Sequence, residues 1–187
     1  MIGFAMCGSF CTFSSVFPQL EVLSSHYEIL PIMSPAAYRI DTRFGTAESW
    51  IKRMEQVTGH RVLHTLAEVE PIGPKKLLDA LIVAPCTGNT LAKLANGISD
   101  TSVTLAVKAH LRNARPVVIA VSSNDALAVN FRNLGALSAM RHFWFVPYRQ
   151  DDALGKPTSL VADMEQIFPT LQDALEGHQV QPILSGR

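Results

Sequence analysis

Small polar residues and a glycine follow the first predicted strand and could form a ligand site there. Residues 2–7 are apolar and run directly into Gly8, Ser9, Phe10, Cys11 and Thr12. Glycine allows close approach to the backbone, and the amides and hydroxyls of such a turn face the N-terminus of the next helix. This chemistry suits a phosphate. The alternative is a plain tight turn between a strand and a helix.

Two features of dinucleotide-binding sites are missing from this part of the sequence. The spacing is not G-x-G-x-x-G, and the second predicted strand is followed by Ser34 where an acidic residue would mark a ribose. The sequence therefore favours a mononucleotide over a dinucleotide, with Ser34 as a further candidate ligand.

Two more predicted strands end in small polar residues. The buried segment 80–84 leads into Pro85, Cys86, Thr87, Asn89 and Thr90, and segment 117–121 leads into Ser122, Ser123, Asn124 and Asp125. The carboxyl ends of parallel strands share one edge of a sheet, where ligands of open α/β sheets bind. We expect these residues to meet the Gly8 turn there. Helix capping by Ser123 or Asp125 is the simpler explanation of the third group.

Arginines in residues 37–45 could bind carboxylates. Arg39 and Arg43 flank Asp41, and a guanidinium group can hold a carboxylate by two parallel hydrogen bonds. A solvated loop with Asp41 as an internal ion partner, or contact with a partner chain, is the alternative.

The elements that must position these residues follow an alternating pattern. Short apolar runs predict strands, and longer segments of helical period predict helices, as in βα units around a mainly parallel sheet. Strands are expected at 2–7, 27–33, 62–66, 80–84, 117–121 and 143–146, and helices at 14–25, 46–57, 89–96, 101–111, 125–139 and 161–175. Residues 37–45 are expected to be a loop, and RQDDALGKPTS a polar link. The 187 residues predict a single domain in which 150–187 form a link and a helix packed on it.

Composition excludes several classes of function. Sixteen basic residues balance sixteen acidic ones, so no net positive field would attract nucleic acid or anionic lipid. No run of eighteen apolar residues could span a bilayer. Three cysteines without metal spacing, and a start without a signal peptide, predict a reducing cytoplasm and no metal site. A positive mean hydropathy predicts a homo-oligomer.

Longer motifs resemble a known family. APCTGNTLAKLANGISD is similar to the PASANT segment of the homo-oligomeric flavin-containing cysteine decarboxylase superfamily. The whole chain resembles the family of dipicolinate synthase B subunits within it, through GSFCT, DTRFG, EPIGPK, RPVVIAVSSNDAL, FVPYRQDD, KPTSLV and ALEGHQVQPIL.

The resemblance implies both a fold and a function. It implies a Rossmann-like or flavodoxin-like three-layer α/β sandwich that binds FMN through the positions of Gly8, Ser9, Phe10, Cys11, Ser34, Pro85, Cys86, Thr87, Asn89, Thr90 and Ser122. It also implies an NADP-binding A subunit as partner, a small dicarboxylate substrate, and oxidation of dihydrodipicolinate to dipicolinate in the mother cell of a sporulating bacterium. Arg39, Arg43 and Asn124 are then candidates for orienting the diacid.

Departures from the superfamily pattern leave the catalytic residue unknown. The position of the relatives' catalytic histidine, about fourteen residues before the PASANT proline, is occupied by Pro71, and their PXMNXXMW segment retains only Asn124. His60 and His64 are nearby, but a lone histidine is more often structural. Cys11 and Cys86 could be nucleophiles, although small buried cysteines are common. A scaffold for the A subunit, or a stand-alone decarboxylase or prenyl-transferring enzyme, is the alternative.

Overall fold

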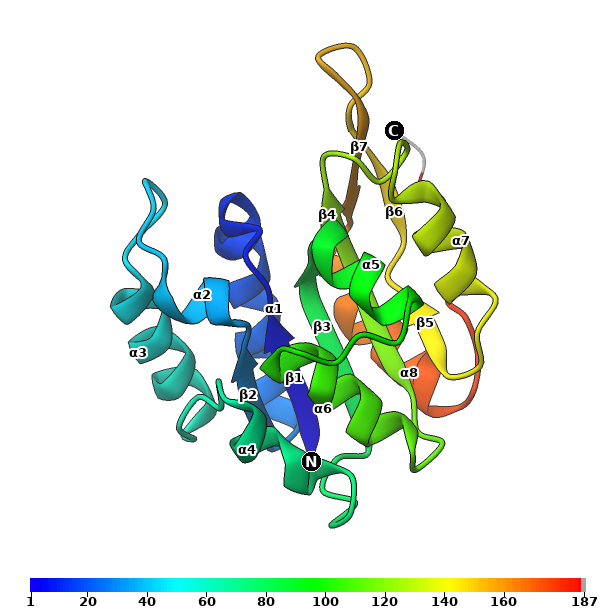
Figure 1. Cartoon of the computed structure of the whole chain (residues 1–187). Coiled ribbons are helices and arrows are strands. Elements are labelled where there is room, and N and C mark those ends of the chain that lie inside the picture. Colours follow the sequence, from blue (N-terminus) through cyan, green and yellow to red (C-terminus); the bar gives the residue numbers. More distant parts are fainter. Residues whose placement is uncertain (186–187) are drawn as a thin grey trace.

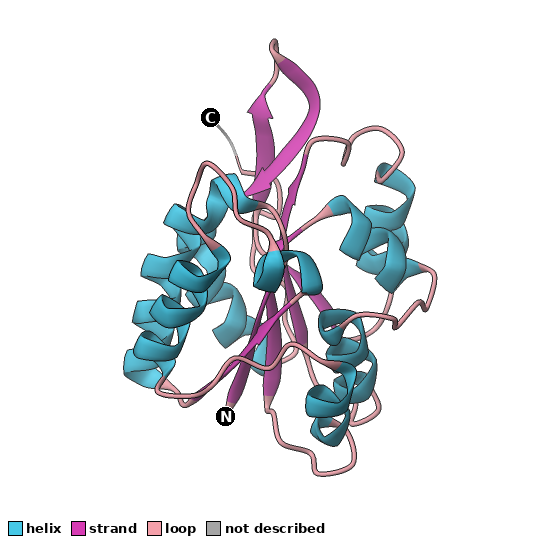
Figure 2. Ribbon diagram, turned by 60° about the vertical axis from the view of Figure 1, so that its left-hand side comes forward, coloured by secondary structure: helices cyan, strands magenta, loops and turns pink. Residues whose placement is uncertain are grey.

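The computed structural model describes residues 1–185, which form one seven-stranded sheet with helices on both faces (Figures 1 and 2). The strands are β1 (Ile2–Met6), β2 (Ile29–Met33), β3 (Ala80–Cys86), β4 (Val117–Ser123), β5 (Phe143–Phe145), β6 (Tyr148–Asp152) and β7 (Lys156–Ala162). The helices are α1 (Phe13–His26), α2 (Pro35–Arg39), α3 (Ala47–Thr58), α4 (Leu66–Val69), α5 (Gly88–Ala95), α6 (Ser102–Leu111), α7 (Phe131–Ser138) and α8 (Ile167–Leu175).

The sheet order explains where a ligand site can lie. Strands β2, β1, β3, β4 and β5 are parallel neighbours in that order, and the antiparallel pair β7 and β6 continues from β4. The chain leaves β1 toward β2 on one side and leaves β3 toward β4 on the other. The two connections diverge, and such a switch point leaves a crevice at the carboxyl ends of the strands. This confirms the predicted α/β three-layer fold with a mainly parallel sheet.

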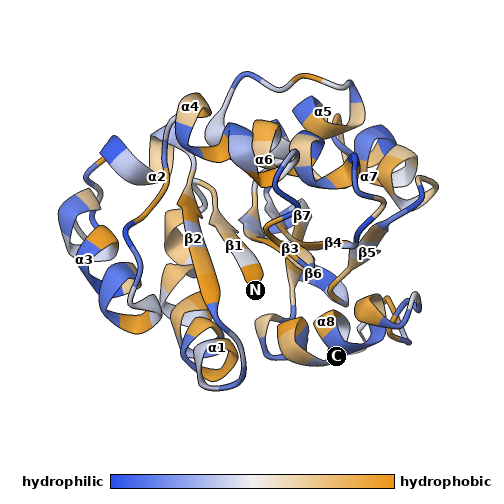
Figure 3. Cartoon of the chain, turned by 90° about the horizontal axis from the view of Figure 1, so that it is seen from below, coloured by the Kyte–Doolittle hydropathy of each residue, from blue (hydrophilic) through white to orange (hydrophobic). Residues whose placement is uncertain are grey.

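Two apolar cores lie on opposite faces of the sheet because successive side chains of a strand point to opposite sides. Phe4 and Met6 of β1 pack with α1, α3 and α8, whereas Ala5 and Cys7 pack with α4, α6 and α7. Figure 3 shows α1 and α8 below the sheet and α4, α5, α6 and α7 above it. No helix among residues 1–185 is long and apolar enough to cross a membrane.

Local capping contacts define several helix ends. Thr46 caps α3 by accepting a hydrogen bond from the amide of Ser49, and Gly59 ends the helix in a left-handed conformation. Thr101 forms a capping box with Thr104 at the start of α6. These local features do not depend on distant parts of the chain, which is why the sequence reveals them.

Two predictions in the first half of the chain were wrong. Residues 37–45 were expected to be a loop throughout, but α2 covers their first part because Ser34 caps it and Pro35 begins it. The strand expected at 62–66 is reduced to one parallel bridge between Ile32 and Leu63, because α4 begins at Leu66.

Two predictions in the second half were also wrong. The helix expected at 125–139 is present only as α7, because the carbonyl of Asp125 accepts the amides of Ala128 and Asn130 in a series of turns. The polar link RQDDALGKPTS is the β6–β7 hairpin, so β5 is not the last strand, and α8 starts at Ile167 instead of Val161. Asp152 accepts hydrogen bonds from the amides of Leu154 and Gly155 at the hairpin turn.

The C-terminal tail covers the end of the sheet beside β5 and β6. The side-chain amide of Gln179 donates to the carbonyl of Phe145 and accepts from its amide, at 2.6 and 2.8 Å. The backbone amide of Tyr148 donates to the carbonyl of Ile183, and the carbonyl of Tyr148 accepts from the amide of Ser185, both at 3.0 Å. The tail therefore continues the hydrogen bonding of the sheet beyond its last strands.

Candidate functional site

Two cavities lie at the carboxyl edge of the sheet, at the switch between β1 and β3. The larger has a volume of about 830 Å³ and the smaller about 360 Å³. Gly8, Thr87 and Asn89 line both. The cavities are thus neighbours across a common border, and the border consists of residues that the sequence singled out.

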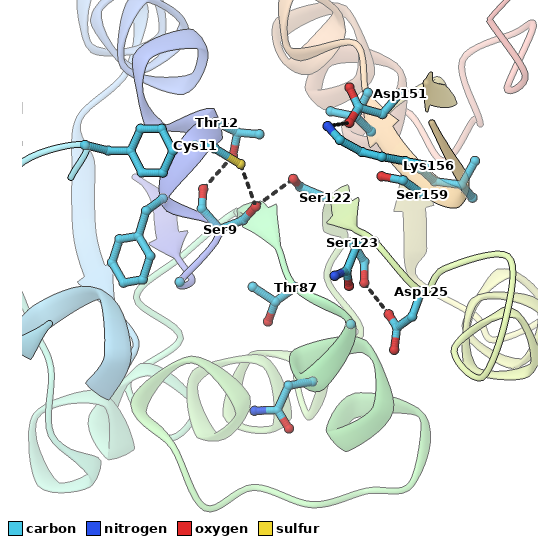
Figure 4. Close-up of a pocket in the computed structure, with 18 residues that line it drawn as sticks. Ser9, Cys11, Thr12, Thr87, Ser122, Ser123, Asp125, Asp151, Lys156 and Ser159 are labelled. Atoms are coloured by element: carbon cyan, nitrogen blue, oxygen red, sulfur yellow. Dashed lines mark hydrogen bonds and ion pairs between the residues drawn. The ribbon is translucent and has the colours of Figure 1, made fainter. Parts of the chain in front are cut away.

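The loop after β1 joins the strand end of β4 through two hydroxyl groups. The Ser9 and Ser122 Oγ atoms lie 2.7 Å apart, and Figure 4 shows the two side chains facing each other. A hydrogen bond between two hydroxyls uses one proton, so the other remains able to donate. Thr12 steadies the loop by donating to the Ser9 carbonyl at 2.8 Å. Phe10, Cys11 and Asn124 also line the larger cavity.

The start of α5 supplies further donors between the two cavities. Thr87 caps the helix by accepting from the Thr90 amide at 3.3 Å, and the Thr90 hydroxyl donates to the Cys7 thiol at 3.3 Å. The first amides of a helix have no partner within it, so those of Gly88 and Asn89 can serve an anion.

The smaller cavity has the features of an anion site. Ser34 caps α2 at its rim, Thr101 caps α6, and the Lys93 ammonium contributes a cation that pairs with Asp100 at 2.7 Å. A methyl group on Gly8 would lie 3.2 Å from the Cβ of Ala36 and narrow the space beside the loop. Glycine at this position therefore leaves the border wider than a side chain would.

The three thiols differ in what they can do. Burial raises the pKa of Cys7 to about 11, although the hydrogen bond from Thr90 acts in the opposite direction. Burial, with a smaller contribution from Cys7, raises the pKa of Cys86 well above its ordinary value. Both are neutral thiols, and Cys86 and Pro85 lie in β3 and line neither cavity. Cys11 is exposed and lines the larger cavity.

The arginine candidates lie away from this edge. Neither Arg39 nor Arg43 lines the two cavities; the Arg43 guanidinium lies 4.9 Å from the ring centre of Phe44, which does line the larger one. Asp41 accepts from the Ala47 amide at 2.8 Å and so caps α3. Asp41, the ion partner of the arginines in the alternative interpretation, thus caps a helix.

The histidines near the predicted catalytic position have structural contacts. His60 lies 3.2 Å from the Glu28 carboxylate, and His64 stacks on Tyr38 with ring centres 3.7 Å apart. Among the residues described, no histidine lines either cavity. No histidine is therefore available as an acid or base on the described cavity walls.

Residues of the hairpin were missed by the sequence reasoning. Asp151, Lys156 and Ser159 line the larger cavity opposite Ser9, because β7 pairs with the end of β4. The Lys156 ammonium lies 2.6 Å from the Asp151 carboxylate. The run of Asp, Ala, Leu and Gly before Lys156 was the available turn signal, but nothing local shows which strand the hairpin joins.

Comparisons with known proteins agree with the fold. A family model described as Flavoprotein matches residues 1–173. The B subunit of dipicolinate synthase from Bacillus subtilis (strain 168) is 43% identical over 184 residues, which cover 98% of this chain and 92% of the relative. The crystal structure of the dipicolinate synthase B subunit from Bacillus halodurans C superposes with a TM-score of 0.91 and 40% identity, covering 100% of this chain and 96% of that one.

A more distant structure shows the same fold. DmrB from Burkholderia xenovorans, solved in complex with FMN and described as a cubic protein cage for redox transfer, superposes with a TM-score of 0.70 at 18% identity. The superposition covers 94% of each chain.

Proposed function

This chain belongs to the flavoprotein family, and from that premise we propose that it is the flavin-binding B subunit of a dipicolinate synthase. On this proposal it works with an NADP-binding A subunit to form dipicolinate from dihydrodipicolinate in the mother cell of a sporulating bacterium. The observation that carries the proposal is the meeting of Gly8, Ser9, Thr87 and Asn89 at the switch point of a flavodoxin-type sheet.

The residues at this edge fit FMN. The smaller cavity offers what a phosphate needs: hydroxyls, helix amides and the Lys93 ammonium. Gly8 keeps the border to the larger cavity open, since a side chain there would meet Ala36 and Phe10. The larger cavity, with Phe10 and Phe44 among its lining residues, has the volume and the apolar surface that a planar ring requires.

Bound FMN would supply a ring that can accept and release electrons. Ser34, Thr87 and Asn89 would hold the phosphate end, whereas Ser9, Phe10 and Ser122 would line the space around the ring in the larger cavity. Asn124 lines that cavity too, and its backbone carbonyl accepts a hydrogen bond from the Thr158 hydroxyl at 2.7 Å. Asn124 can therefore orient a substrate, while the nicotinamide belongs to the A subunit.

A stand-alone decarboxylase is disfavoured because neither cavity contains a histidine in the described chain. The remaining alternative is a scaffold that keeps the fold but serves only to assemble the A subunit. The two ideas differ in whether a ligand site is needed, and the site described above favours the flavin-binding subunit.

The test has two steps. The purified chain is mixed with FMN and passed through a desalting column, and the proposal expects flavin absorbance to remain with the protein. NADP-linked dipicolinate formation by the A subunit is then measured with the flavin-loaded chain and with the Asn89→Asp variant. Equal stimulation by both, with no flavin retained by either, would favour the scaffold.

A further inference from the structure

We propose that Lys156 binds a carboxylate of the anionic substrate in the larger cavity, and that Asp151 competes with the substrate for it. This inference rests on the proposed function and assigns the substrate-binding cation of the same cavity. Lys156 lies at the start of β7, and Figure 4 shows its ammonium beside Asp151 and pointing toward the loop that carries Cys11 and Thr12.

Charge is the first argument for Lys156. It is the one cation among the described residues that line the larger cavity, which also contains the carboxylates of Asp125 and Asp151. The hydrogen bond from Lys156 to Asp151, together with the negative charge of Asp151, raises the pKa of the lysine, so the ammonium is charged at neutral pH. A dicarboxylate in this cavity would meet no other cation on the walls formed by residues 1–185.

The two carboxylates that line the larger cavity, Asp125 and Asp151, are not equivalent. Asp125 is engaged in its own turn, since its side chain accepts from the Ser123 hydroxyl at 2.5 Å and from the Asn130 side-chain amide at 2.8 Å. Asp151 has Lys156 as its partner, at 2.6 Å, and their side chains are 39% and 58% exposed. An exposed ion pair contributes little to stability, so a substrate carboxylate can replace Asp151 at low cost.

The opposite wall offers a second binding point for a diacid. Ser9 and Ser122 share one hydrogen bond and so keep one hydroxyl proton to donate. A planar ring with two carboxylates could then contact the ammonium with one group and the hydroxyls with the other. Arg39 and Arg43, the candidates from the sequence, do not line this cavity.

The experiment is a titration of the flavin-loaded chain with pyridine-2,6-dicarboxylate, followed by calorimetry and by the flavin spectrum. Lys156→Met is expected to weaken binding at least tenfold, because the cation is removed. Asp151→Asn is expected to strengthen it severalfold, because the competing carboxylate is removed. Lys108→Met, which changes an exposed lysine of α6 outside both cavities, is the matched control and should bind like the unaltered chain.

The outcomes separate this inference from the proposed function. Unchanged affinity in Lys156→Met, or weaker binding in Asp151→Asn, overturns the role of Lys156 even when FMN is retained. Failure of the unaltered chain to retain FMN contradicts the proposed function, and calorimetry on the flavin-free chain then still compares the same variants. The proposed function and the role of Lys156 are both supported if the unaltered chain retains FMN, Lys156→Met binds the diacid more weakly and Asp151→Asn binds it more tightly.

Discussion

Asn89 connects the two cavities, so its substitution tests the flavin site directly. A carboxylate in Asn89→Asp would repel the phosphate and lose a donor at the border of the cavities. We expect the dissociation constant for FMN to rise about tenfold, which corresponds to about 1.4 kcal/mol. Fluorescence titration measures it, with His60→Ala as the control that should leave FMN binding unchanged.

His110 predicts a pH dependence of stability. The residue is fully buried; burial lowers its pKa to about 4, while its hydrogen bond to the Pro116 carbonyl acts in the opposite direction. The folded chain keeps the ring neutral, whereas the unfolded chain binds a proton below about pH 6.5. The free energy of unfolding should therefore fall as the pH drops from about 6.5 to about 4, by at most about 3 kcal/mol from this group.

The contribution of His110 can be isolated by substitution. Urea unfolding of the unaltered chain and of His110→Gln, which keeps a side-chain donor, is measured at pH 7.5 and pH 5. The loss of stability at the lower pH should be smaller in the variant. An equal loss in both would show that other groups cause the acid sensitivity.

Single site residues were predictable only where they follow a strand of the parallel sheet. Ser9 and Thr87 follow apolar strands and Ser122 lies near the carboxyl end of one, so their meeting follows from the topology of βα units. Lys156 and Asp151 were not predictable, because they reach the cavity through the antiparallel pairing of β7 with β4. That pairing joins segments far apart in the sequence.

The start of α5 is positioned by a close packing contact at Gly88. A Cβ atom there would lie 2.5 Å from the Ser123 hydroxyl and 2.6 Å from both the Asp125 carboxylate and the Asn130 amide. Gly88→Ala should therefore destabilise the fold by about 1–3 kcal/mol and weaken FMN binding, because the helix amides move. Thermal unfolding and FMN titration measure the two effects.

Gly135 of α7 offers the matched control. It is an exposed helix glycine, and a Cβ atom added there would meet no other atom within 4 Å. Gly135→Ala should therefore stabilise the chain by about 0.5–1 kcal/mol. Similar effects of the two substitutions would contradict the packing role assigned to Gly88.

Elements with local signals were predicted, and those defined by tertiary contacts were missed. The apolar run of β4 and the capped, glycine-ended α3 are recognisable in isolation. Strand β6 consists of mostly exposed polar residues and looks like a linker until its pairing with β7 is known. The false helical start at 125–130 has apolar spacing, but Asp125 holds it in turns.

In the whole molecule, the β6–β7 hairpin and the two cavities lie at the same end of the sheet. Figure 1 shows the β6–β7 hairpin projecting from the end of the sheet where β1, β3 and β4 deliver their polar residues. Phe10 and Cys11 come from the first part of the chain, and Lys156 from the last. The larger cavity can therefore form only after the antiparallel strands have joined the parallel sheet.

Removing the C-terminal tail should affect the whole molecule differently from any of these substitutions. In a chain that ends at Gly177, Phe145 and Tyr148 lose the partners supplied by Gln179, Ile183 and Ser185. Circular dichroism is expected to show a folded protein, while light scattering should rise with time and concentration. Gln179→Ala should show a weaker form of the same behaviour; a truncated chain that stays monodisperse would contradict this.

The expected aggregation follows from the backbone groups that the truncation leaves without partners. Amide and carbonyl groups left at the margin of a sheet are a template on which a strand of another molecule can add. Because the tail occupies those groups at Phe145 and Tyr148, we expect it to prevent intermolecular strand addition. Residues 178–185 line neither of the two cavities, so their expected contribution is protection from aggregation and not ligand binding.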